Sequence, residues 1–129
     1  MVNGFAFNTT RQAFLANHLR RADTHLSRLV GLMGTAPGAL SSGRGLWIVP
    51  CHGVHTFGMR YAIDLVYLNQ HLQVVHTEEN VRPWRMAAVR MEAATVLELP
   101  PYTIYQTGTC IGDHVEISFA QNGNGGGQS

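Results

Sequence analysis

Short apolar runs separated by turn residues dominate the pattern of hydrophobic and polar positions along this chain. Residues 46–49 are continuously apolar and stop at Pro50, and residues 63–68 are apolar apart from Asp64. Apolar runs of about four to eight residues bounded by turn signals are typical of strands. Because the second run is apolar on both faces, it predicts a central strand covered on both sides.

Further strands are predicted from alternating or short apolar patterns at residues 5–8, 54–59, 72–76, 95–99 and 114–119. In the last of these, Val115, Ile117 and Phe119 share one face and polar side chains occupy the other. This alternation predicts a strand with one face in water. Residues 69–71 predict a hairpin loop, residues 78–91 a polar loop, and residues 102–106 a single helical turn.

The N-terminal third contains one ambiguous segment and one clear helical pattern. Residues 11–20 fit both the alternation of a strand and the stripe of a helix, and spacing alone does not choose between them. Asp23 or Thr24 provides a helix cap, and apolar residues then recur with helical spacing at positions 26, 29, 30 and 33. We therefore expect a helix of two to three turns that ends at Gly34, followed by a surface loop over residues 36–45.

These elements together predict a mainly β fold of six to eight short strands with one short helix. The absence of strand–helix alternation favours a β-sandwich or a partly open barrel. With 129 residues, 45% of them hydrophobic, residues 1–120 are expected to form a single β domain. Residues 121–129 consist almost entirely of Gly, Asn and Gln and predict a disordered tail.

Charge and cysteine content narrow the classes of function. Nine basic residues against eight acidic ones leave a formal charge of +1, which predicts that nucleic acid is not a partner. No apolar segment approaches the roughly 20 residues of a membrane span. Cys51 and Cys110 are too few for a disulfide framework and are expected to be reduced. We expect a cytoplasmic protein, unless an export leader precedes this sequence.

Side chains that can bind a ligand or a metal lie on both sides of residue 58. They define a candidate ligand pocket of Cys51, His52, His55, Arg60 and Asp64. Thiolate, imidazole and carboxylate form an acceptable zinc set. Residues three apart on a strand point to opposite faces, however, so the two histidines converge only if Gly53 bends the chain. The favoured interpretation is a non-catalytic binding module for a small molecule or a protein, with no catalytic residue, metal or cofactor assigned. The alternative is a metal-assisted hydrolase that uses Cys51, His52, His55 and Asp64.

Two acidic residues on predicted strands receive different interpretations. An ionised Asp64 among apolar neighbours requires partners, and those expected are Arg44, His55, Thr56 and Arg60. Asp64 is then either a structural carboxylate or a pocket acid or base with a perturbed pKa. Glu98 is opposite in parity to Leu97 and Leu99, so it is expected to lie on a solvated face.

Arg82, Trp84 and Arg85 form a candidate contact loop for a ligand or a protein, because Trp and Arg are enriched at binding hot spots. The alternative is that Trp84 covers an edge of the core.

Several short motifs occur in an order that resembles one known family. They are Gly31-Leu32-Met33, Gly45-Leu46, His55-Thr56-Phe57-Gly58-Met59, Ile63-Asp64, Val96-Leu97-Glu98-Leu99-Pro100 and Gly112-Asp113-His114-Val115. Over about residues 19–117 the chain resembles the DUF192 family of small bacterial and archaeal proteins of unknown function. The resemblance implies a jelly-roll-like β fold, favours a strand for residues 11–20, and implies no activity or cofactor. Members commonly have a Gly soon after the Leu-Glu-Leu-Pro run, where this chain has Pro101-Tyr102, so we expect a different turn there.

Overall fold

The computed structural model describes residues 3–22 and 43–120, and its strands form one seven-stranded sheet. The strands are β1 (Gly4–Asn8), β2 (Ala13–Ala22), β3 (Arg44–Ile48), β4 (Ile63–Leu68), β5 (Val74–Val81), β6 (Thr95–Leu99) and β7 (Val115–Phe119). The spatial order is β5-β4-β6-β3-β2-β1-β7, with β2 and β3 parallel and the other neighbours antiparallel. The predicted helix over residues 23–33, most of the loop after it and the predicted tail lie outside the described residues.

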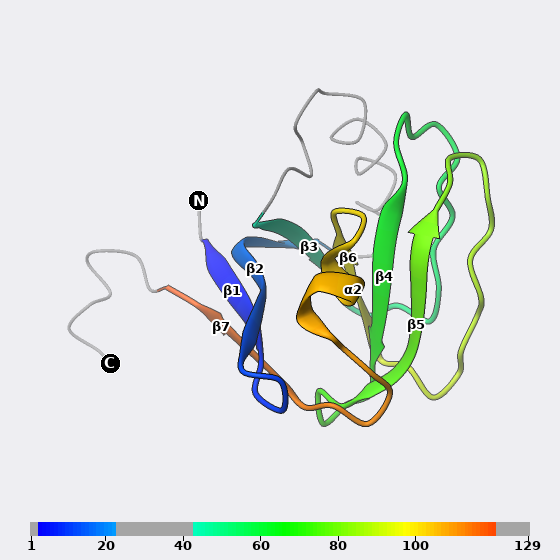
Figure 1. Cartoon of the computed structure of the whole chain (residues 1–129). Helices are drawn as coiled ribbons and strands as arrows, with labels where there is room; N and C mark the ends of the chain where they lie inside the picture. Colours follow the sequence, from blue (N-terminus) through cyan, green and yellow to red (C-terminus); the bar gives the residue numbers. More distant parts are fainter. Residues whose placement is uncertain (1–2, 23–42, 121–129) are drawn as a thin grey trace.

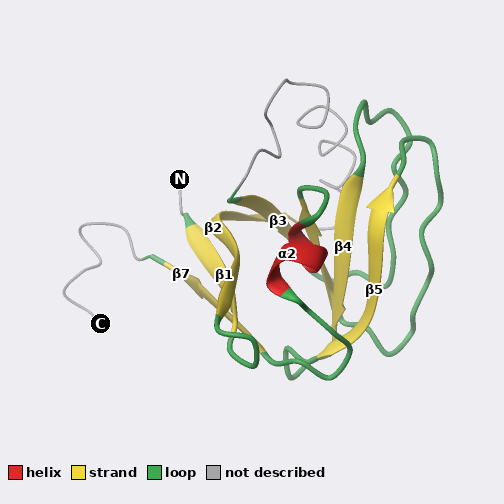
Figure 2. Ribbon diagram, viewed as in Figure 1, coloured by secondary structure: helices red, strands yellow, loops and turns green. Residues whose placement is uncertain are grey.

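The sheet curls into a half-barrel around the short helix α2 (Thr103–Thr107), as Figures 1 and 2 show. The mainly β fold is therefore confirmed, and the partly open barrel is the predicted alternative that describes it. The helical turn expected at residues 102–106 is confirmed. Among the described residues, no helix is long and apolar enough to cross a membrane.

The two faces of the sheet pack against different partners. On the face toward α2, Leu97 and Leu99 of β6 join a core cluster with Ile104 of the helix. On the opposite face, Val96 of β6 belongs to a second cluster that includes Cys51 and residues of β3 and β4. All residues of β4 and β6 are buried, so the prediction of a strand covered on both faces at residues 63–68 is confirmed.

The second face is covered by two long connections, residues 49–62 between β3 and β4 and residues 82–94 between β5 and β6. Five backbone hydrogen bonds join them, each with an N···O distance of 2.9–3.0 Å: they pair Cys51 with Ala94, His52 with Arg90, Val54 with Ala87, and Thr56 with both Arg85 and Trp84. Together these connections form a covering layer over the core of the second face.

Two sequence predictions are wrong about this region. Residues 54–59 do not form a strand: only an isolated bridge between His55 and Met86 is present, and Gly58 turns the chain with φ +86°. The predicted loop at residues 78–91 is also wrong at its start, because β5 continues to Val81. Its polar residues stay extended because their backbones pair with β4, as Glu78 does with Leu65.

The ambiguous segment at residues 11–20 is a strand over most of its length. β2 begins at Ala13 and is paired on both sides, with β1 and with β3. Partners distant in the sequence therefore select one of two periodicities that the local pattern allows. Cys51 and Cys110 are both free thiols, as predicted.

Candidate functional site

Asp64 is a satisfied structural carboxylate on the α2 side of the sheet. It is fully buried, and its two oxygens accept hydrogen bonds from the backbone N–H groups of Asn80 at 2.8 Å and Ile104 at 2.9 Å. The partners expected from the sequence are therefore wrong; these were Arg44, His55, Thr56 and Arg60. Asp64 ties β4 to the end of β5 and to α2.

Asp113 is a second buried acid with a full set of partners. Its Oδ2 accepts hydrogen bonds from Arg11 Nε at 2.9 Å, Asn8 Nδ2 at 3.0 Å and the Cys110 N–H at 2.9 Å. These bonds hold the turn before β7 against the end of β1.

Glu98 is the third buried acid, and the prediction that it is solvated is wrong. It is 2% exposed, lies on the face opposite Asp64, and pairs in the ladder with Leu46 and Leu65. Among the described residues, its Oε1 has no hydrogen-bond partner. Burial raises the pKa of Glu98 to about 8, so near neutral pH the side chain is a neutral carboxylic acid.

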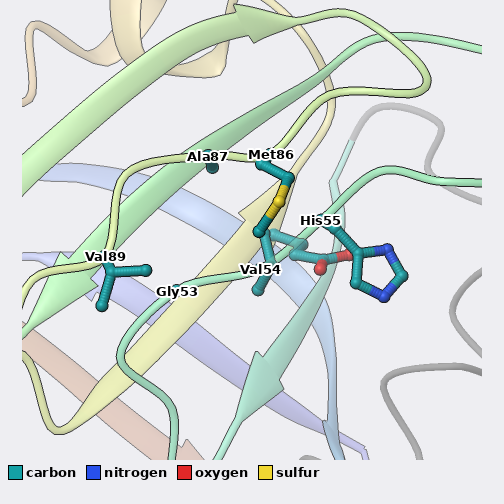
Figure 3. A pocket seen from close by; sticks show the side chains of 7 residues that line it. Gly53, Val54, His55, Met86, Ala87 and Val89 are labelled. Atoms are coloured by element: carbon teal, nitrogen blue, oxygen red, sulfur yellow. The ribbon is translucent and has the colours of Figure 1, made fainter.

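Glu98 lines a pocket of about 160 Å³ between the sheet and the covering connections. The other lining residues are Gly53, Val54, His55, Met86, Ala87 and Val89, and Figure 3 shows how they lie. Met86 and Val89 approach from the connection before β6, and Val54 approaches from the connection before β4 (Figure 3). A mostly apolar hollow with few polar groups is the usual composition of a small-molecule site.

Gly53 allows the two connections to approach closely enough to form this wall. A Cβ at position 53 would lie 2.7 Å from the carbonyl oxygen of Ala88, which is closer than carbon and oxygen tolerate. The short distance between the two backbones therefore requires a glycine at this position.

His55 is the pocket residue that links the cavity to the surface. Its Nδ1 accepts the N–H of Phe57 at 3.2 Å, so the proton of the neutral ring resides on Nε2. The His55 ring stacks on Phe57 with centroids 4.7 Å apart, and Phe57 stacks on Trp84 at 6.0 Å. In Figure 3 the ring is turned away from Met86 and Val89.

The structure brings only His55, among the five residues of the predicted pocket, to this cavity. Cys51 is buried, donates its thiol to the Gly53 carbonyl at 3.1 Å, and has a pKa raised by burial and by nearby Glu98. The Nδ1 of His52 lies 2.7 Å from the Ala93 carbonyl oxygen, and its ring borders a separate surface depression. Arg60 is exposed and Asp64 faces α2, so neither lines the cavity.

The proposed zinc set consequently does not converge. Within residues 3–22 and 43–120, no three His, Cys, Asp or Glu side chains lie close enough together to hold a metal ion. Asp64 is separated from Cys51 and the histidines because it projects from the other face of the sheet.

The sequence around Glu98 resembles the sequence around Asp64, in that an acid stands within an apolar run. It stands between Leu97 and Leu99 in a short apolar run that ends at Pro100. Alternation suggests a wet face, whereas a central strand is buried on both faces. The local pattern does not distinguish these two cases.

The predicted contact loop is exposed and held in a defined shape. Trp84 is 65% exposed, so the alternative that it covers a core edge is wrong, and its φ of +64° is unusual for a large side chain. The Thr56 hydroxyl donates to the Arg82 carbonyl at 2.7 Å and accepts the Arg85 N–H at 2.8 Å. The Trp84 N–H donates to the Thr56 carbonyl at 3.0 Å.

Comparison with known proteins finds relatives without an assigned activity. The DUF192 family model (Uncharacterized ACR) matches residues 6–117. A UPF0127 protein of Pyrococcus furiosus is 28% identical over 114 residues, which cover 84% of this chain and 94% of that protein.

Two solved structures share the fold. A protein of unknown function from Novosphingobium aromaticivorans has a TM-score of 0.70 at 17% identity, covering 88% of this chain and 83% of its own. A protein of Sinorhizobium meliloti named a "putative transcription regulator" has a TM-score of 0.66 at 20% identity, covering 90% and 93%. At these identities the likeness shows the fold alone.

Proposed function

Because the chain belongs to the DUF192 family, whose description assigns no activity, we propose a function from the pocket itself: a non-catalytic domain that binds a small molecule over Glu98. The hydrolase alternative is not supported, since its four residues do not converge.

The unpartnered Oε1 of Glu98 is the observation that carries this proposal. Burying a polar group without a hydrogen bond costs about 1–3 kcal/mol in proteins. Asp64 and Asp113 avoid this cost by accepting backbone and side-chain hydrogen bonds, whereas no described residue forms a hydrogen bond with Oε1 of Glu98. A group kept at the expense of stability beside an apolar hollow is typical of a binding site.

The test is a screen of small organic compounds by thermal shift, followed by NMR mapping of the hits. A ligand at 100 times its Kd stabilises the folded state by about 2.7 kcal/mol. We expect hits to shift the amide signals of residues 53–55 and 86–89.

A matched pair of variants separates pocket binding from surface binding. Val89 lines the pocket and is 62% exposed, and Ile111 is 64% exposed and is not a lining residue. Val89→Phe is expected to fill the mouth and abolish binding with little change in melting temperature, whereas Ile111→Phe is expected to bind as the parent does. Hits that bind equally well to Val89→Phe would count against this pocket.

A second candidate function, contact with a protein partner, is favoured by the exposed stack of His55, Phe57 and Trp84. Thr56 holds the Arg82–Arg85 turn, so the Trp84 ring is presented on an ordered backbone. Rigid aromatic side chains beside arginines are typical of binding hot spots.

Photo-crosslinking tests this surface in the native cells. p-Benzoylphenylalanine placed at position 84 is expected to give a discrete adduct with one protein. The matched control is position 105, where Tyr105 of α2 is 79% exposed. The absence of an adduct specific to position 84 would reject the contact surface.

A further inference from the structure

We propose that the pocket over Glu98 binds short aliphatic ligands that end in a carbonyl-type oxygen, as a carboxylate or an amide, and that this oxygen accepts a hydrogen bond from Glu98. The inference rests on the binding function proposed above and adds the chemical class of the ligand.

The hydrogen-bonding inventory of the pocket calls for an acceptor. The side chains of Val54, Met86, Ala87 and Val89 offer no strong acceptor, and no described residue accepts a hydrogen from Glu98. In its acid form Glu98 carries one O–H donor. The second polar lining residue, His55, supplies no acceptor to the pocket either, because its Nδ1 is occupied by the Phe57 N–H and its ring is turned away from Met86 and Val89. A ligand oxygen therefore complements Glu98.

The charged groups around the pocket favour the same class. The ladder neighbours of Glu98 are Leu46 and Leu65, which carry no charge, and Arg44, two residues before Leu46 on β3, is exposed. From the connection before β4, Cys51 and His55 are the titratable groups near Glu98.

The connection before β6 adds positive charge at the surface. Arg85 and Arg90 bracket the lining residues 86–89, both are exposed, and neither forms an ion pair with a described residue. Of the acids on and beside this connection, Glu92 is exposed, whereas Glu78 of β5 is engaged by His76 Nε2 at 3.1 Å and by the Ala88 N–H at 3.0 Å. A cationic ligand would therefore be repelled at the entrance, whereas an anionic or neutral one would not.

The volume limits the length of the aliphatic chain. A protein cavity of about 150 Å³ accommodates benzene, and the cavity over Glu98 measures about 160 Å³. A four-carbon carboxylate or amide has a similar size. Butanoate and butanamide are consequently suitable probes, and butylammonium is a probe of matched length with the opposite hydrogen-bonding character.

The experiment measures the affinity of each probe between pH 6 and pH 10 from the amide shifts of residues 53–55 and 86–89. We expect butanoate and butanamide to bind below pH 8. The affinity of butanoate, which has no hydrogen-bond donor, should fall about tenfold per pH unit above pH 8 as Glu98 loses its proton. Butylammonium is expected to show no binding below pH 8. Binding of butanamide without butanoate would still support the acceptor class and would show that the arginines add nothing.

Substitution of Glu98 isolates its contribution. Glu98→Gln keeps the shape and an N–H donor, so it should bind butanoate without the loss above pH 8, whereas Glu98→Leu should bind butanoate at least tenfold more weakly. Glu116→Gln, which removes an exposed carboxylate of β7, should behave as the parent. If Glu98→Gln does not fold, the pH profile of butanoate binding to the parent still decides.

The outcomes distinguish the ligand class from the binding function. Butylammonium binding that strengthens with pH would overturn the ligand class and leave the pocket as a binding site. Screening hits that lack an oxygen acceptor but bind Val89→Phe more weakly than the parent would also overturn the ligand class and support the pocket as a binding site. If none of the three probes shifts the pocket amides at any pH, the ligand class is rejected, and the screen alone then decides the binding function.

Discussion

At the scale of single residues, hydrogen-bond partners separate the two acids of β4 and β6. Asp64 accepts two backbone N–H groups, whereas Glu98 lies between Leu46 and Leu65 and its Oε1 has no partner in the described part of the chain. Asp64 therefore stabilises the fold, whereas the burial of Glu98 lowers the free energy of unfolding. Substitution should therefore change stability in opposite directions.

Asp64→Ala is expected to destabilise the protein by about 2–4 kcal/mol, because two buried backbone N–H groups lose their acceptor. Asp64→Asn retains one acceptor oxygen and should lose less. Urea unfolding of both variants beside the parent measures the effect. A variant at least as stable as the parent would contradict the structural role.

Glu98→Gln is expected to become more stable than the parent as the pH rises. The carboxyl pKa is 4.5 in the unfolded chain and about 8 in the folded protein. Between these values the folded state keeps a proton that the unfolded chain has released, so the stability of the parent falls by up to about 1.4 kcal/mol per pH unit. Below pH 4.5 and above pH 8 the contribution of Glu98 to the free energy of unfolding no longer changes with pH.

Urea unfolding at pH 5, 6, 7 and 8 measures this difference. The free energy of unfolding of Glu98→Gln should diverge upward from that of the parent, and the exposed control Glu116→Gln should follow the parent. Parallel curves for Glu98→Gln and the parent would show that Glu98 is not buried in its acid form.

At the scale of elements, the two covering connections owe their shape to side-chain and backbone contacts rather than to regular strands. Gly53 permits their close approach, and Thr56 holds the turn that presents Trp84. The pocket and the aromatic stack lie on the same pair of segments. A change that loosens these segments should therefore affect both.

Thr56→Val is expected to lower stability by about 1–3 kcal/mol, because the Arg85 N–H and the Arg82 carbonyl lose their partner while the shape is kept. Hydrogen exchange should accelerate at residues 84–86 and not in β4. Thr77→Val, at a half-buried position of β5, is the control. Unchanged exchange at residues 84–86 would show that the hydroxyl does not hold the turn.

At the scale of the whole molecule, the formal charge of +1 limits the range of partners. A protein with few uncompensated cations releases few counterions from a polyanion and gains little affinity. The structural likeness to a protein named as a regulator of transcription does not alter this expectation, because at 20% identity it concerns the fold alone.

We therefore expect only weak binding to DNA and RNA, with affinity that disappears as salt is raised to physiological concentration. Fluorescence anisotropy with short duplex and single-stranded probes measures it across a salt series. Submicromolar binding at physiological salt would contradict the prediction.

The sequence alone determined the strands whose signal is local. Residues 63–68, 95–99 and 114–119 carry apolar runs or alternation next to turn residues such as Asn69, Pro100 and Gly112, and they account for β4, β6 and β7. Backbone geometry imposes this two-residue period whatever the rest of the chain does. The run over residues 63–68, apolar on both faces apart from Asp64, likewise predicts a strand covered on both sides whatever the partners of Asp64 are.

Only the tertiary structure decided which acid is satisfied and where the cavity lies. The partners of Asp64 are backbone groups 16 and 40 residues away, and backbone N–H groups leave no mark in a sequence. Glu98 is buried because β3 and β4 flank β6 and two connections pack over that face. Alternation shows which side of a strand a residue occupies, but burial depends on what packs against that side, and distant segments provide it.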